Sequence, residues 1–504
     1  MKKRLYDKEE NFSPNTDAPL SLEDLRNRFD RCDDIVFHTI AIASVRGCLV
    51  YLKILASERA LVDIQRGLAG IAPEAVSACV SPAQMLDALH SRFLLGRTMP
   101  NSLSILREIL SGNVVLVAEG TDVVFVFQTA SDSGRAIEEP STDQVVRGSR
   151  EGFVERIETN IQLIRRKIQT SALKVQYMTV GKQSQTRLAI MHIEGIAKDS
   201  IVKEVRRRLN AIKIDAVLES NYIEELISDG PYSPFPTLYN SERPDRVSGD
   251  ILEGKVAILT DGTPFVLTAP ALFGEFFQSN ADYYDNFYAA SIIRFIRILG
   301  ALIALLLPAF FVAVTTIHQD LMQTPFLIRV AGNREDLPFP VIVEALFMQL
   351  TFEVVREAGL RMPKAIGNAL TIVGTLVIGQ AAVQAGLVGA LMVIVVAFTA
   401  LTTFILPNYT FMQVFRYGNF PMMILASMFG LMGILVGLLF LLAHLCSLRS
   451  FGVPFLSPVS PFAKEGWKDT FIRAPWWFMK KRNPMAAQGN ENRENTKAPA
   501  PPKR

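Results

Sequence analysis

A set of amide and hydroxyl side chains lies inside the least charged part of this sequence. Residues 365–415 contain no Asp, Glu, Lys or Arg, and at about 20 residues per helical span the run is long enough for two membrane crossings. Within it, Thr371, Thr375, Gln380 and Gln384 place hydrogen-bonding groups at membrane depth. Such groups tend to face protein or a water path rather than lipid, so the chemistry they offer is the passage of water or ions.

These polar residues fall on two helical faces. Gln380 and Gln384 lie one turn apart with Val377 on the same face, whereas Thr371 and Thr375 lie roughly 140° away. We expect one face to line a pore or gate and the other to pack against a neighbouring subunit. For the two glutamines, hydrogen bonding between packed helices is the alternative to pore lining.

A carboxylate, Glu344, lies in a second apolar segment at 338–364. No charged residue lies three or four positions away, so Glu344 is either an isolated intramembrane acid or an acid in water on a surface helix. Glu353, in the same segment, is spaced to pair with Arg356 and is expected at the membrane interface. In an oligomer, several copies of Glu344 can concentrate cations near a pore entrance.

Composition and motifs argue against several other classes of protein. A net charge of +3 gives no indication of nucleic-acid binding. The sequence has no P-loop, no GxGxxG after a strand, no GxSxG and no HExxH. Its four Cys have no CxxC spacing, so neither a disulfide framework nor a metal site is predicted. We therefore expect no enzyme activity, no catalytic residues and no cofactor.

The rest of the sequence predicts the elements that hold this stretch. Strand and helix patterns alternate through the first 290 residues and predict an α/β cytoplasmic region of two subdomains, followed by an α-helical transmembrane domain. Strand-then-helix patterns at 51–68 and 192–209 hint at repeated modules. Helices are predicted at 21–29, 57–68, 81–94, 198–212 and 220–227 and in the second half of 145–169. Hairpins are predicted around 119–122 and, as a two-residue turn, at 261–262.

Membrane spans are predicted at 290–317 and 419–448, with two further segments at 366–384 and 385–406. Arg294 and Arg297, at the start of the first span, and the basic residues after 448 favour cytoplasmic N- and C-termini. An even number of crossings is then required. We expect about four, with either 338–356 or 366–384 forming a re-entrant or interfacial helix.

The expected organisation divides the chain into seven segments. They are a flexible leader at 1–20, a first α/β subdomain at 21–130, a linker at 131–144, a second α/β subdomain with a linker helix at 145–289, a helical membrane domain at 290–448, a basic amphipathic cytoplasmic tail at 449–482 and a disordered tail at 483–504.

Several long segments, in the right order, resemble the A subunits of bacterial spore germinant receptors, the GerA family. The resemblance covers most of residues 145–482 and is weaker over 1–130. It rests on five segments: VRGSREGFVERIETNIQLIRRKI, SERPDRVSGDILEGKVAILTDGTPFVLTAPALFGEFFQS, VREAGLRMPKAIGNALTIVGTLVIGQAAVQAGLVGALMVIVV, FGVPFLSPVSPF and DTFIRAPWWFMKKRNP.

The resemblance implies a multi-pass subunit of the spore inner membrane. Such a subunit acts with a transporter-like, nutrient-binding B subunit and a C subunit lipoprotein. It also implies a homo-oligomer, expected to be a pentamer, that forms a nutrient-gated ion channel and triggers germination. Two alternatives remain open: a non-conducting scaffold subunit of the receptor, or the paralogous sporulation-operon channel that amplifies ion release.

Overall fold

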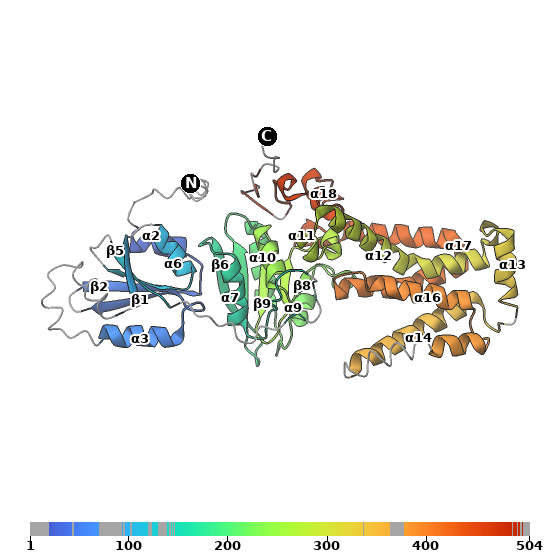
Figure 1. The fold of residues 1–504 in the computed structure, drawn as a ribbon, viewed down its shortest axis with the longest axis horizontal. Helices are drawn as coiled ribbons and strands as arrows, with labels where there is room; N and C mark the ends of the chain where they lie inside the picture. Colours follow the sequence, from blue (N-terminus) through green and yellow to red (C-terminus); the bar gives the residue numbers. More distant parts are fainter. Residues whose placement is uncertain are drawn as a thin grey trace, which may run out of the picture.

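The computed structural model describes residues 20–493 and residue 496, except 43–44, 70–92, 94–95, 101–102, 119–122, 130–138, 141–142, 144, 146, 336, 363–376, 486 and 491. The chain is elongated, with two α/β subdomains followed in line by a bundle of helices (Figure 1). This confirms the predicted class, an α/β region of two subdomains followed by a helical domain.

The first subdomain is a five-stranded antiparallel sheet with helices on its two faces (Figure 1). Ser21 caps its first helix, because Ser21 Oγ accepts the Asp24 N–H at 3.0 Å and the Asp24 carboxylate accepts the Ser21 N–H. The elements are α2 (Leu22–Arg28), β1 (Ile35–Ile42), β2 (Val45–Leu52), α3 (Glu58–Ala69), β3 (Gly96–Pro100), α6 (Ser104–Leu110), β4 (Val114–Ala118) and β5 (Val123–Phe127).

The second subdomain repeats the topology of the first. Its sheet has the order β6-β7-β9-β10-β8, which matches β1-β2-β4-β5-β3 strand for strand, so the expected repeat of modules is confirmed. Phe153, Ile157, Ile161 and Ile164 bury one face of the linker helix against this sheet. The elements are α7 (Ile157–Lys167), β6 (Leu173–Val180), β7 (Thr186–Ile193), α8 (Asp199–Ala211), α9 (Ser220–Ile227), β8 (Tyr239–Ser241), α10 (Pro244–Leu252), β9 (Val256–Thr260), β10 (Val266–Ala269), η1 (Phe273–Phe277) and α11 (Ala281–Tyr284).

Most predicted local elements of the two subdomains are present. The hairpin around 119–122 joins β4 to β5, although the turn itself lies outside the described residues, as does most of the predicted helix at 81–94. The second hairpin is confirmed, because β9 pairs antiparallel with β10, but its predicted two-residue turn at 261–262 is wrong. β9 ends at Thr260 and β10 begins at Val266, and Asp261 instead accepts bonds from the Ile157 N–H and the Arg187 guanidinium.

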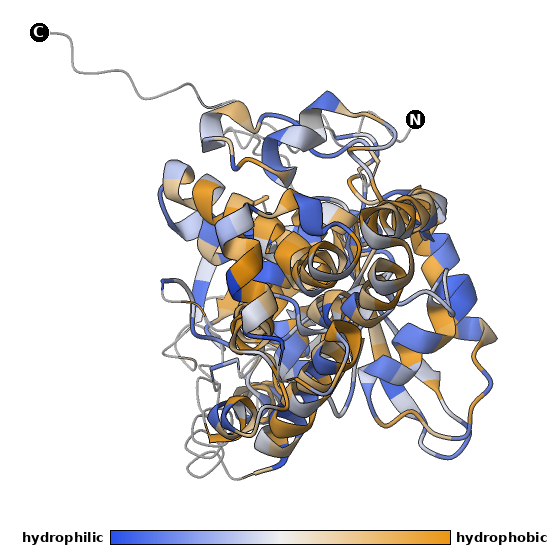
Figure 2. Cartoon of the chain, turned by 90° about the vertical axis from the view of Figure 1, so that its right-hand side faces the viewer, coloured by the Kyte–Doolittle hydropathy of each residue, from blue (hydrophilic) through white to orange (hydrophobic). Residues whose placement is uncertain are grey.

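The helical domain packs against the second subdomain at one end, here called the near end, and carries α13 at the opposite, far end (Figure 1). Seen from the far end, the helices are mainly apolar (Figure 2). Two described helices, α12 and α17, are long and apolar enough to cross a membrane. The elements are α12 (Phe287–Thr316), η2 (Gln319–Leu321), α13 (Thr324–Gly332), α14 (Val341–Arg361), a helical turn region at 377–384, α16 (Ala390–Thr403) and α17 (Tyr409–Ser447).

The last predicted span, 419–448, is not one straight helix. Gly430 has φ +62° and ψ −139°, a backbone conformation that residues other than glycine rarely adopt. It lies against His318 at the far end. Gly437 packs against Met422 and Leu425, although residues 422 and 437 of a continuous helix would be about 22 Å apart. α17 is therefore a hairpin of two helices, 409–429 and 431–447, that starts and ends at the near end.

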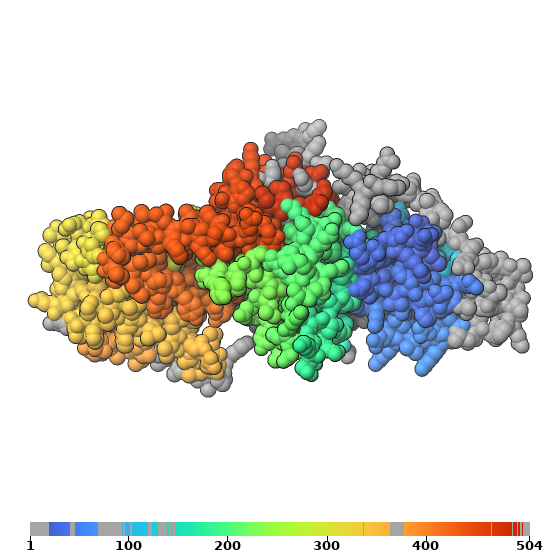
Figure 3. Space-filling model, turned by 180° about the vertical axis from the view of Figure 1, so that it is seen from behind, coloured from blue at the N-terminus to red at the C-terminus, as the bar shows by residue number. Residues whose placement is uncertain are grey.

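The C-terminal segment, residues 449–493, leaves the helical domain and lies over its junction with the second subdomain (Figure 3). The predicted disorder of 483–504 is wrong for the described part, because the Gln488 N–H donates to the Ile196 carbonyl at 2.7 Å and Arg493 pairs with Glu253 at 3.2 Å. Its elements are β11 (Arg449–Ser450), β12 (Val453–Pro454), α18 (Lys464–Thr470) and η3 (Trp476–Phe478).

Candidate functional site

Three of the five predicted pore residues share one exposed face of the helix at 377–384. Val377 is 55% exposed, and Gln380 and Gln384 are exposed beside it. The opposite face is packed, since Ala382 is buried and a Cβ on Gly379 would lie 3.5 Å from Val393 of α16. The polar face therefore points away from the rest of the chain. The other two candidates, Thr371 and Thr375, lie outside the described residues.

The structure shows Glu344 as a paired acid rather than an isolated one. Its side chain is 1% exposed, and its carboxylate accepts the Arg334 Nη2–H at 3.0 Å and the Gly389 backbone N–H at 3.1 Å. Gly389 is the N-cap of α16, where a negative charge is favoured by the helix dipole. Glu344 thus joins the connection after α13, its own helix α14, and the start of α16. A search at helical spacing missed Arg334 because it lies ten residues away, across the bend that precedes α14.

A second group of buried charges lies between α14 and α17, closer to the near end. Glu353 pairs with Arg356 at 3.0 Å, as its spacing predicts, and also with Arg416 of α17 at 3.2 Å. Arg416 is 2% exposed and its guanidinium lies 4.5 Å from the ring centre of Tyr417. Sequence analysis missed Arg416 because it directly follows the charge-free run, where it looks like a flanking residue.

The near end is held by a third group of charges centred on Asp282. This carboxylate is almost fully buried and accepts bonds from Arg294 and Arg297 of α12, both at 2.8 Å. Arg294 also pairs with Asp469 of α18 at 3.0 Å. Tyr283 donates to Asp469 at 2.9 Å, and burial raises the pKa of this phenol, which keeps it protonated as a donor. The start of α12 is therefore fastened to both the second subdomain and the C-terminal segment.

This arrangement offers polar surface and charge pairs rather than reactive chemistry. Within the described part of the chain, no group of three or more His, Cys, Asp and Glu side chains is placed to hold a metal ion. The structural feature that calls for a functional explanation is the face formed by Val377, Gln380 and Gln384, because two amide groups are exposed together on one face of a helix that packs its opposite face.

Comparison with known proteins assigns the family. The profile described as "Bacillus/Clostridium GerA spore germination protein" matches residues 23–485. The chain belongs to the GerA family. The match begins within the first subdomain, so the family relationship is broader than the resemblance at 145–482 indicated.

Individual relatives in the GerA family span most of the chain. The "Uncharacterized membrane protein YfkQ" of Bacillus subtilis is 41% identical over 94% of both chains. "Spore germination protein KA" of Bacillus subtilis is 47% identical over 77% of this chain and 71% of its own. The crystallised N-terminal domain of the A subunit of the Bacillus megaterium germinant receptor GerK3 is 33% identical and covers 51% of this chain and 96% of its own. Its superposition has a TM-score of 0.40, so the fold described above rests on the present structure.

Proposed function

We propose that this GerA-family chain is a channel-forming subunit of a spore germinant receptor. Several copies would surround water with the face formed by Val377, Gln380 and Gln384. The observation that carries the proposal is that two amide side chains, Gln380 and Gln384, are exposed together on one face of the helix at 377–384. Exposed apolar side chains on α12 and α17 can face lipid at no cost, whereas two amides cannot.

We further propose six membrane crossings instead of four. The chain would cross at α12, α14, the segment ending at 384, α16 and the two arms of α17. Three contacts support alternating directions: Gly389 lies beside Glu344, Asn408 bonds to Asn240 of the second subdomain at 3.0 Å, and His444 lies 2.9 Å from Ser233. An even count leaves both termini on the cytoplasmic side, where Arg294, Arg297 and the basic C-terminal segment gather.

Membership of the GerA family supports a proposal for the assembly as well. Copies of the chain would form a closed ring, five in number, in the spore inner membrane, together with a transporter-like B subunit and a lipoprotein C subunit. Nutrient binding to the B subunit would shift a closed–open equilibrium of the ring. A carboxylate already neutralised by a guanidinium attracts cations weakly. In this ring, Glu344 would therefore act through its ion pair with Arg334 and not by concentrating cations.

Cysteine crosslinking tests the proposed pore. In a background in which Cys79 and the exposed Cys446 are replaced by Ala, Val377→Cys and Gln380→Cys should each form dimers of the chain on mild oxidation and react with a membrane-impermeant thiol reagent. Phe440→Cys is the matched control, since Phe440 is 77% exposed on an apolar face of α17. It should react only with a lipid-soluble reagent.

The same experiment separates the channel from a scaffold. A scaffold subunit that packs its glutamines against another protein predicts no self-crosslinks and no aqueous labelling at 377 or 380. That result would remove the pore proposal while leaving the family assignment intact.

A further inference from the structure

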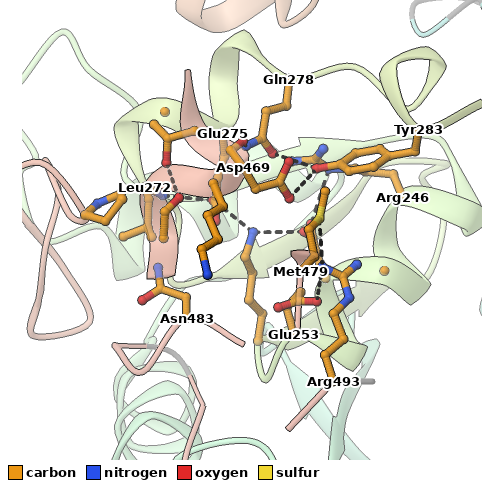
Figure 4. A pocket seen from close by; sticks show the side chains of 18 of the residues that line it. Arg246, Glu253, Leu272, Glu275, Gln278, Tyr283, Asp469, Met479, Asn483 and Arg493 are labelled. Atoms are coloured by element: carbon orange, nitrogen blue, oxygen red, sulfur yellow. Dashed lines mark hydrogen bonds and ion pairs between the residues drawn. The ribbon is translucent and has the colours of Figure 1, made fainter. Parts of the chain in front are cut away.

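A cavity of about 270 Å³ lies where the second subdomain meets the C-terminal segment. One wall comes from α10 and η1, with Arg246 and Glu275, and the other from the C-terminal segment, with Ser457, Asp469 and Trp476. Figure 4 shows side chains from both walls pointing into the same space. The cavity lies outside the helical bundle, so it is separate from the proposed pore.

Each carboxylate that lines this cavity is paired with a basic side chain, and Lys255 serves two of them. Each one has a basic partner within 3.2 Å: Asp245 with Arg243 at 2.7 Å, Asp250 with Lys255 at 2.9 Å, Glu253 with Arg493 at 3.2 Å, Glu275 with Lys255 at 2.8 Å and Asp469 with Arg294 at 3.0 Å. The lining itself contains five acids and five basic side chains, and Arg243 and Arg294 add positive charge from just outside it. Since every acid is paired, the carboxylates do not exclude a negatively charged occupant, and the unused donors described next decide what binds.

Two buried polar groups face this space with unused hydrogen-bonding capacity. Arg246 is only 6% exposed, yet its Nε–H and Nη2–H have no hydrogen-bond partner among the described residues. The nearest carboxylate, on Asp250, is 3.7 Å from Nε, which is beyond hydrogen-bond distance. Ser457 Oγ, on the other wall, is fully buried and equally unpartnered within the described part of the chain.

The geometry of Arg246 indicates which ligand would satisfy it. Nε–H and Nη2–H form one edge of the guanidinium, the two-donor edge that binds a carboxylate or phosphate through parallel hydrogen bonds. The guanidinium is held by the ring of Tyr239, whose centre is 4.6 Å away. An arginine positioned in this way is ready to bind an anionic oxygen group without rearrangement.

We propose that this cavity binds a small anion bearing a carboxylate or phosphate group, held by Arg246 on the subdomain side and Ser457 on the side of the C-terminal segment. Because such a ligand contacts both walls, it binds the docked arrangement better than a separated one and stabilises it by mass action. The anionic group can belong to a free small molecule or to a lipid headgroup, since the cavity adjoins the start of α12.

Intrinsic fluorescence can test this site in the full chain. All three Trp residues, at 467, 476 and 477, lie in the C-terminal segment, and Trp476 lines the cavity, so tryptophan emission reports on the site directly. The protein in phosphatidylcholine nanodiscs is titrated with inorganic phosphate at constant ionic strength, set with sodium chloride. A saturable change in emission is expected. In a second arm without phosphate, nanodiscs that also contain phosphatidylglycerol replace the neutral ones.

Three variants accompany both arms. Arg246→Lys keeps the charge but loses the two-donor edge, so it should raise the Kd for phosphate about tenfold or more. Lys481→Glu, at an exposed position, should raise the Kd about threefold. Arg207→Lys, exposed on α8 and remote from the cavity, should leave it unchanged.

The two arms identify the source of the anion. Saturable phosphate binding that Arg246→Lys and Lys481→Glu both weaken supports a free-anion site. A change with phosphatidylglycerol alone, lost in the same two variants, supports a lipid headgroup. No saturable change in either arm, or changes that both variants leave intact, would overturn the proposal.

Discussion

Replacing Glu344 by Gln should loosen the far end of the helical domain. The wild-type carboxylate is 1% exposed and accepts one bond from Arg334 and one from the Gly389 N–H. Gln keeps an acceptor oxygen for Gly389 but leaves the guanidinium without its counter-charge. Breaking a buried ion pair costs about 3–5 kcal/mol, and because the Arg334 side chain is 23% exposed we expect the lower figure, about 3 kcal/mol of unfolding free energy.

Denaturant unfolding of the purified protein in detergent micelles measures this loss. Glu335→Gln is the matched control, an exposed carboxylate in the same segment, and should change stability by less than about 0.5 kcal/mol. A double-mutant cycle with Arg334→Gln should give a coupling energy of about 2 kcal/mol. Additive effects in that cycle would refute the pairing. A cost for Glu344→Gln no larger than that of the control would refute the burial argument.

Three further predictions concern the α17 hairpin, the second subdomain and the near end. Gly430→Ala should cost about 2 kcal/mol from backbone strain alone, before the contact with His318, and should lower the unfolding midpoint in the same assay. Burial lowers the pKa of His192 to about 4, below its unfolded value. The contribution of neutral His192 to the free energy of unfolding should therefore be fully present above about pH 6.5 and fall by about 3 kcal/mol as the pH approaches 4. In acid unfolding curves, His192→Gln should reduce this dependence on pH. Asp282→Asn should cost about 3 kcal/mol, because Arg297 loses its counter-charge and Arg294 keeps only Asp469, and should make the C-terminal segment more sensitive to limited proteolysis.

The α/β region was largely predictable because its signals are local. The Ser21 cap, the apolar face at 157–164 and the strands at 173–193 each follow from spacing within a few residues. The pairing of β3 with β5, and its repetition as β8 with β10, could not be predicted. Those strands are joined through long connections whose pairing no short pattern specifies.

The helical domain was predicted less completely for a physical reason. Hydropathy is averaged over a window, so a straight apolar helix and an apolar helical hairpin give the same profile. The turn is seen in the structure, from the conformation of Gly430 and the contacts of Gly437. Charge pairs were missed for a related reason. Glu344 with Arg334 and Glu353 with Arg416 join different segments, beyond the three- or four-residue spacing that a helix brings together. The candidate pore face was predictable because Val377, Gln380 and Gln384 share one helix.

Single-channel recording tests the central proposal most directly. Purified protein carrying Gln380→Cys in the same background, with Cys79 and Cys446 replaced by Ala, would be reconstituted into planar bilayers and exposed to a charged, water-soluble thiol reagent. The account predicts discrete conductance steps that the reagent reduces or blocks, with no effect on the matched Phe440→Cys protein. Steps of unchanged size after complete modification of residue 380 would contradict it.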